Sequence, residues 1–172
     1  KGWLEQTADG GWRWRPEFDL GYSSIPILVH DADGDGDSDI LWGLGHNYGV
    51  YWAEQTTVDG KRTWDKHLID DSWSQPHFLL MADLNNDGRA ELVTGKRYHA
   101  HNGHDPGGND ARCVYYYSLD VASKTWTRHL MHEGGTVGFG INTQAVDIDG
   151  DGDVDVVAPG KSGLYLFENL LK

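Results

Sequence analysis

Three short segments of the sequence carry mostly acidic or amide side chains at alternate positions, an arrangement that suits a bound cation. They read DADGDGDSDI from Asp31, DLNNDGRAEL from Asp83 and DIDGDGDVDV from Asp147, and their starts lie 52 and 64 residues apart. Oxygen ligands at every second position, with a glycine that permits a tight turn, match the about six to eight oxygens that Ca²⁺ prefers. Mg²⁺ fits less well because it takes fewer protein ligands and retains its waters. The pattern therefore predicts three calcium loops.

Each loop offers equivalent ligands, which are the side chains of its first, third, fifth and ninth residues and the main-chain carbonyl of its seventh. In the first loop these are Asp31, Asp33, Asp35, Asp39 and the carbonyl of Asp37. In the second they are Asp83, Asn85, Asp87, Glu91 and the carbonyl of Arg89. In the third they are Asp147, Asp149, Asp151, Asp155 and the carbonyl of Asp153. A solvated acidic turn without an ion is the alternative, and the recurrence of one ligand spacing in three loops argues against it.

The loops also account for much of the acidity of the chain. The formal net charge is −13, from 27 acidic and 14 basic residues, and 13 of the acidic residues lie in the three loops. Three bound Ca²⁺ ions would add six positive charges and change −13 to −7. An acidic balance of this size argues against a basic surface for nucleic acid.

The segments that flank the loops repeat as well, in an order typical of a β-propeller blade. Apolar runs precede the loops (IPILVH, HFLLMA, NTQAV), and short strands follow them (DILWG, ELVTG, DVDVVAPG). Aromatic strands come next (GVYWAEQ, VYYYSLD, GLYLFEN), and two repeats add a fourth strand (TWDKHLID, TWTRHLMH). Four short antiparallel strands in a unit of about 50 residues are the pattern of one blade.

This all-β chain is expected to form about three blades, with strands grouped as two, four, four and three. We expect the outer strands of a first blade in residues 1–24, blades in 25–70 and 76–132, and an incomplete blade in 141–172. A closed propeller typically has about 4 to 8 blades. The segment is therefore expected to form part of a larger ring, completed by a longer polypeptide or by other copies, because three isolated blades would leave strand edges open.

Composition agrees with a strand-rich domain. The 172 residues include 23 Gly, eight Trp and eight Tyr, a mixture that favours strands and turns. No apolar run approaches the roughly 20 residues of a membrane-spanning helix. The first residues show no apolar signal region, so a secreted form would already have lost its signal. The single Cys113 leaves no partner for an intramolecular disulfide.

The remaining loops should lie on the face opposite the calcium loops, because antiparallel strands alternate in direction. These loops gather histidines and aromatic residues over a rigid scaffold, where binding residues are common. Ligand-binding candidates on this face are His46, Tyr48, Trp73, Gln75, His77 and Tyr98. Tyr48, Trp73 and Tyr98 suit stacking on sugar rings.

The longest of these loops, KRYHAHNGHDPGGNDARC from Lys96, has three histidines followed by Asp105. His99, His101 and His104 are candidate ligands of a second metal, Zn²⁺ or a similar divalent ion. His46 or His77 could reach the same place. Three interpretations of this loop stay open: a hydrogen-bonded structural loop, a sugar-binding surface, and a metal or acid–base site.

The triple acidic loop makes the chain resemble the FG-GAP or VCBS repeat proteins, whose calcium loops also occur in the propellers of integrin α-subunits. The resemblance extends over essentially all 172 residues. It implies a propeller, often with seven blades, that is usually extracellular or periplasmic. It implies no single activity, because such repeats occur in adhesion modules, lectin-like binders and polysaccharide lyases.

Residues 72–107 are also similar, more distantly, to the propeller part of sugar dehydratases such as aldos-2-ulose dehydratase. A dehydratase would need a cation to polarise a carbonyl and a base to remove the neighbouring proton. By this resemblance His77 or Tyr98 would be the base, and Lys96 or Arg97 would hold a developing oxyanion.

The favoured prediction is a calcium-stabilised extracytoplasmic propeller segment whose face binds carbohydrate or protein. The alternative is a metal-dependent sugar lyase or dehydratase that uses the loop from His99 to His104. The expected partners of the chain are the remaining blades and a carbohydrate or protein ligand. We expect no binding of nucleic acid and no membrane span.

Overall fold

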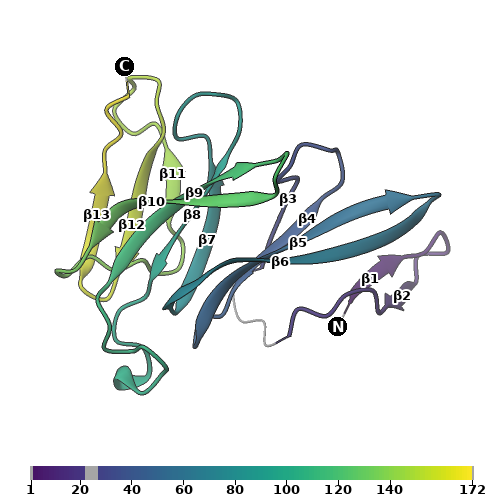
Figure 1. The fold of residues 1–172 in the computed structure, drawn as a ribbon, viewed down its shortest axis with the longest axis horizontal. Coiled ribbons are helices and arrows are strands. Elements are labelled where there is room, and N and C mark those ends of the chain that lie inside the picture. Colours follow the sequence, from purple (N-terminus) through teal and green to yellow (C-terminus); the bar gives the residue numbers. More distant parts are fainter. Residues whose placement is uncertain (1, 22–26, 172) are drawn as a thin grey trace.

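The computed structural model describes residues 2–21 and 27–171, which form four separate antiparallel sheets (Figure 1). The two-stranded sheet consists of β1 (Trp3–Gln6) and β2 (Trp12–Arg15). The next sheet has the order β3 (Ile27–His30), β4 (Asp39–Gly43), β5 (Tyr48–Val58), β6 (Lys61–Ser74). The third has the order β7 (Pro76–Ala82), β8 (Glu91–Lys96), β9 (Cys113–Asp120), β10 (Thr125–Glu133). The last has the order β11 (Gln144–Val146), β12 (Asp155–Gly160), β13 (Gly163–Phe167).

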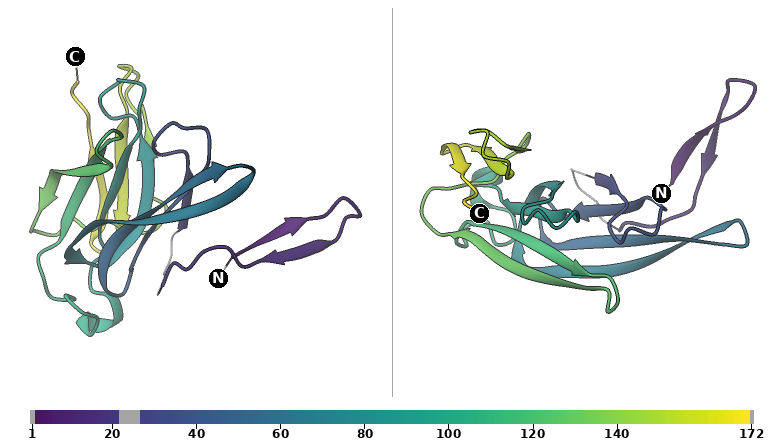
Figure 2. Two further views of the ribbon diagram at one scale, coloured as in Figure 1. Left: turned by 45° about the vertical axis from the view of Figure 1, so that its right-hand side comes forward. Right: turned by 90° about the horizontal axis from the view of Figure 1, so that it is seen from above.

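The all-β class and the grouping of strands into two, four, four and three are confirmed. Successive strands pair in chain order within every sheet, as in the blades of a propeller. The described residues form no closed ring, and the β1–β2 hairpin projects away from the other sheets (Figure 2). The predicted boundary between residues 24 and 25 lies outside the described residues.

The core lies between neighbouring sheets, because successive side chains of a strand point to opposite faces. In β4, Leu41 packs into the cluster between the second and third sheets. The next residue, Trp42, belongs to a different cluster, which includes Leu20 from the segment before β3. In β8, Leu92 joins the same central cluster and Val93 faces the last sheet. The inner strands are therefore apolar on both faces.

The sheets contact each other through side chains. The Trp73 indole N–H in β6 donates a hydrogen bond of 2.8 Å to the Tyr117 hydroxyl in β9. An ion pair of 3.0 Å joins Arg128 in β10 to Asp70 in β6. The buried Glu54 carboxylate in β5 accepts hydrogen bonds of 2.7 Å from Lys124, in the turn between β9 and β10.

The connection from β6 to β7 is shorter than the sequence suggests. Trp73, Gln75 and His77 were expected on a loop, but β6 continues to Ser74, which pairs with Tyr48 of β5, and His77 lies in β7. Only Gln75 separates the two strands, and it adopts a φ of 66°. Its N–H donates to the Asn47 carbonyl at 2.8 Å, which fixes this sharp turn.

Candidate functional site

Each acidic loop joins the first strand of a sheet to its second strand, as predicted (Figure 1). The first aspartate of a loop accepts hydrogen bonds from main-chain N–H groups further along it. Asp31 accepts from Gly34 at 2.8 Å and Gly36 at 3.0 Å, and Asp147 accepts from Gly150 at 2.7 Å and Gly152 at 3.1 Å. The φ of Gly36 is 95° and that of Gly152 is 97°, values that side chains rarely permit.

The side chain of the ninth residue closes each loop by a hydrogen bond back to its second residue. The Asp39 carboxylate accepts the N–H of the second loop residue at 3.1 Å, and the equivalent bonds of Glu91 and Asp155 are 2.8 and 3.0 Å. All three carboxylates are buried. Burial raises the pKa of Asp39 and of Glu91 above the ordinary carboxyl value. These residues therefore hold the loops in shape whether or not they also ligate an ion.

In the first and third loops, the acidic side chains of the first, third and fifth residues converge. Carboxylate oxygens of Asp31, Asp33 and Asp35 lie within 4.8 Å of one another, and so do those of Asp147, Asp149 and Asp151. In the second loop the third residue is Asn85, whose amide oxygen accepts the Asp87 N–H at 2.9 Å. All three loops thus present hard oxygen donors in the same order.

Asp153 distinguishes the third loop. This residue is only 3 % exposed, and neither of its carboxylate oxygens has a hydrogen-bond partner among the residues that the structure describes. Burial and the neighbouring carboxylates, Asp151 foremost, raise the pKa of Asp153 to about 6. The equivalent residue of the first loop, Asp37, is partly exposed, and Arg89 of the second loop is exposed. Sequence spacing suggested only a carbonyl ligand at this position.

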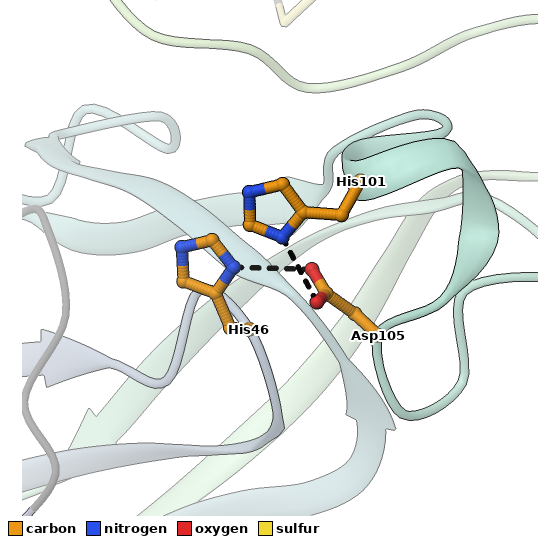
Figure 3. Close-up of side chains that lie close together, drawn as sticks. All are labelled: His46, His101 and Asp105. Atoms are coloured by element: carbon orange, nitrogen blue, oxygen red, sulfur yellow. Dashed lines mark hydrogen bonds and ion pairs between the residues drawn. The ribbon is translucent and has the colours of Figure 1, made fainter.

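A second cluster lies around the loop between β8 and β9, which contains a short 3₁₀ helix, η1 (Ala100–Gly103). Asp105 is its centre, as Figure 3 shows. Its two oxygens lie 3.1 Å from His46 Nδ1 and 3.0 Å from His101 Nδ1, and the two imidazole rings are stacked 4.6 Å apart. Burial alone would raise the pKa of Asp105, but its hydrogen bonds to His101, His46 and Arg97 lower it to about 2.

Arg97 occupies the space between two members of this cluster. Its Nη2 atom lies 3.1 Å from the Asp105 carboxylate and 2.9 Å from His46 Nδ1. The imidazole nitrogen accepts a hydrogen bond when it lacks a proton, so His46 Nδ1 either accepts from Arg97 or donates to Asp105, depending on its tautomer, while Asp105 accepts from Arg97 in both cases. The cluster therefore contains its own cation.

The three histidines predicted to act together are separated in the structure. Only His101 joins Asp105, and its second partner is His46 from the loop between β4 and β5. His104 is exposed, and the His99 carbonyl accepts a hydrogen bond of 3.1 Å from Lys161. The contact with His46 follows from the alternation of loop directions, which places both loops at the same end of their sheets.

Beside this cluster is a pocket of about 460 Å³. Among the described residues that line it are His77, Arg97, Tyr98, His101, Ile141 and Lys161. Burial lowers the pKa of His77 to about 4, and the charge of Arg97 and the nearby His46 contribute to this shift. His77 is therefore uncharged at neutral pH, and Arg97 and Lys161 contribute positive charge to the pocket. Sequence reasoning did not select Ile141 or Lys161 as binding residues.

Other predicted residues lie in the core or hold the long loop by hydrogen bonds. The Lys96 ammonium group is buried and donates to the Ser74 hydroxyl at 2.6 Å and the Gly107 carbonyl at 2.7 Å. Trp73 lies in the core and Gln75 is fully buried. The Tyr48 hydroxyl donates to Asp110 at 2.8 Å. Of the proposed stacking aromatics, only Tyr98 lines the pocket.

Antiparallel sheets that follow one another along the chain, three of them with an acidic loop between their first two strands, define a β-propeller-like segment. Residues 31–94 match the sequence profile of the FG-GAP-like repeat, and this stretch contains the first two acidic loops. The chain thus carries an FG-GAP-like repeat, a kind of repeat that normally forms part of a larger propeller and is typically extracellular. No curated protein matched the chain. No helix of the described residues is long and apolar enough to cross a membrane.

Proposed function

We propose that this chain is a calcium-stabilised propeller segment that presents the pocket beside Asp105 as an extracellular ligand-binding surface. The observation that carries the proposal is the recurrence of one arrangement in three loops. In each loop a buried ninth carboxylate accepts the N–H of the second residue. In the first and third loops the carboxylate oxygens of the first, third and fifth residues also converge.

The donor chemistry of the loops fits Ca²⁺, which prefers carboxylate, amide and carbonyl oxygens in a flexible set. Asp153 adds an independent argument, because a buried carboxylate without a partner costs several kcal/mol unless a positive charge compensates it. The residues that would hold the ions are those predicted from the spacing, with the Asp153 carboxylate added in the third loop. A bound ion would neutralise the loop carboxylates and tie the first two strands of each sheet together.

The test is the calcium content of the full chain after equilibrium dialysis against about 1 mM Ca²⁺, the range in which extracellular calcium modules bind their ions, measured by inductively coupled plasma mass spectrometry. We expect about three Ca²⁺ per chain. The matched variant Asp33→Asn should lose about one ion, and Asp59→Asn, in the β5–β6 hairpin, should lose none. A chain that holds no calcium above the dialysis background would overturn the proposal.

A metal-dependent sugar lyase or dehydratase is the second candidate, and one observation favours it. His101 lines the pocket while its Nδ1 atom contacts the Asp105 carboxylate, and a carboxylate that orients an imidazole is a common arrangement for a general base. Lys96 is buried and fully engaged, so an oxyanion in the pocket would instead meet Arg97 or Lys161.

The two candidates are separated by incubating the chain with oligosaccharides, with and without added Zn²⁺, and following unsaturated products by ultraviolet absorbance. The binding proposal expects no product. Product that forms with the wild-type chain and is lost in His101→Gln would favour the enzyme, and one tightly held Zn²⁺ per chain would assign it a second metal.

A further inference from the structure

The charge of the pocket beside Asp105 is opposite to that of the molecule. The chain carries a formal charge of −13, yet none of the described residues that line this pocket is acidic. Arg97 and Lys161 contribute positive charge, and His77 and His101 contribute imidazole groups. A cationic pocket attracts an anionic ligand, and without acidic residues in its lining no neighbouring carboxylate of the pocket wall repels that ligand.

The cations are held in place by contacts that leave donors available. Asp105 fixes Arg97 Nη2 at 3.1 Å, so the guanidinium enters the pocket wall in one orientation. Lys161 donates to the His99 carbonyl at 3.1 Å, and its ammonium group has further hydrogens to donate. Fixed cations of this kind suit a carboxylate, which accepts charge-assisted hydrogen bonds from more than one donor.

The rest of the lining suits the other groups of a sugar. Tyr98 and Ile141 provide an apolar surface, and the imidazoles of His77 and His101 can donate or accept hydrogen bonds from hydroxyl groups. The volume of about 460 Å³ lies within the range of about 300–1,000 Å³ that is usual for small-molecule sites.

We propose that this pocket binds a saccharide that carries a carboxylate, with Arg97 and Lys161 contacting the carboxylate group. This inference rests on the proposed function and names the chemical class of its ligand. An acidic peptide also carries carboxylates, but the sugar is favoured because the remaining polar groups of the pocket are hydrogen-bonding imidazoles beside a single aromatic ring.

The test is titration of the calcium-loaded full chain with sodium D-glucuronate, D-glucose and sodium acetate, followed by isothermal calorimetry and saturation-transfer NMR. Glucuronate should bind at least about tenfold more tightly than either control, since charge-assisted hydrogen bonds and sugar contacts both contribute. Lys161→Met should weaken glucuronate binding about tenfold. Lys61→Met removes the same charge from an exposed position in the β5–β6 hairpin and should change nothing.

Three outcomes would overturn the inference. Glucose binding as tightly as glucuronate would remove the role of the carboxylate, and acetate binding as tightly would remove the sugar. Binding of an acidic peptide such as tetraglutamate with no binding of glucuronate would assign the pocket to proteins. The proposed calcium function survives all three, because it is decided separately by the calcium content of the same sample.

Discussion

Asp153 is the residue for which the structure adds most to the interpretation of the acidic loops. Because its buried carboxylate has no hydrogen-bond partner in residues 2–21 and 27–171, we expect it to contribute to an ion in the third loop. Asp153→Asn should weaken one of the three calcium sites about tenfold or more, as loss of a charged ligand does. Asp37→Asn, at the same position of the first loop, should have a smaller effect because Asp37 is partly exposed. Calcium calorimetry on both variants measures the difference, and equal effects would contradict the expectation.

His77 should make stability depend on pH. Burial and the nearby charges of Arg97, His46 and His101 lower its pKa to about 4, from an ordinary value of 6.5. As the pH falls from 6.5 to 4, the unfolded chain binds a proton at this residue before the folded chain does, so the folded state loses stability. Urea unfolding at pH 7 and pH 5 should therefore show a larger loss for the wild-type chain than for His77→Gln. The same pH dependence in both chains would assign the loss to other groups.

Individual binding residues were only partly predictable from sequence. The prediction placed His101 and Asp105 on one face with His46, and these three side chains are in contact. His99 and His104 lie elsewhere because the loop passes through left-handed conformations at His99 and His101, which local spacing does not reveal. Whether a tryptophan such as Trp73 faces ligand or core also depends on packing between sheets.

At the scale of elements, Lys96 connects the end of β8 to the long loop. Its ammonium group donates to the main chain and hydroxyl of Ser74 and to the Gly107 carbonyl. Lys96→Met would leave these buried acceptors unsatisfied, so we expect a loss of roughly 2–4 kcal/mol in the free energy of unfolding. Urea unfolding measures this change, with Lys61→Met as the exposed control. An unchanged free energy would show that water replaces the ammonium group at no cost.

The strands were more predictable than the connections. Repetition of the loop and its flanks revealed the order of strands, because each copy supports the assignment of the others. The predicted loop between β6 and β7 was wrong. Mostly polar stretches such as residues 70–75 are typical of loops, but the pairing of Ser74 with Tyr48 keeps residues up to Ser74 in the sheet. Tertiary pairing of this kind overrides local propensity.

At the scale of the whole molecule, calcium should stabilise the folded chain. Ions that bind the folded loops and not the unfolded chain stabilise by mass action, by about 2.7 kcal/mol for each site at a free concentration one hundred times its Kd. We therefore expect the melting temperature to rise with Ca²⁺ and to fall on addition of EDTA. Magnesium at the same concentration should have a smaller effect. A melting temperature that calcium leaves unchanged would contradict the structural role of the loops.

The two ends of the row of sheets should associate with further blades. Trp12 in β2 is 65 % exposed and Leu164 in β13 is 72 % exposed, and apolar surface of this kind promotes contact. We expect the purified 172-residue chain to elute above its monomer mass of 19.2 kDa in size-exclusion chromatography with light scattering. Leu164→Lys should reduce this association more than Val58→Lys, which alters a similarly exposed apolar side chain near the tip of a hairpin. A wild-type chain that stays monomeric at all concentrations would contradict the expected association.

The separation of the sheets has a consequence for how such a chain can change in length. In the part of the chain that the structure describes, neighbouring sheets share no strand pairing, and a single residue, Gln75, links the two four-stranded sheets. Duplication of one sheet with its acidic loop would therefore insert a unit without breaking a hydrogen-bonded ladder in the units beside it. The fold is open to growth by gene duplication, one unit at a time, and each new unit would bring its own cation loop.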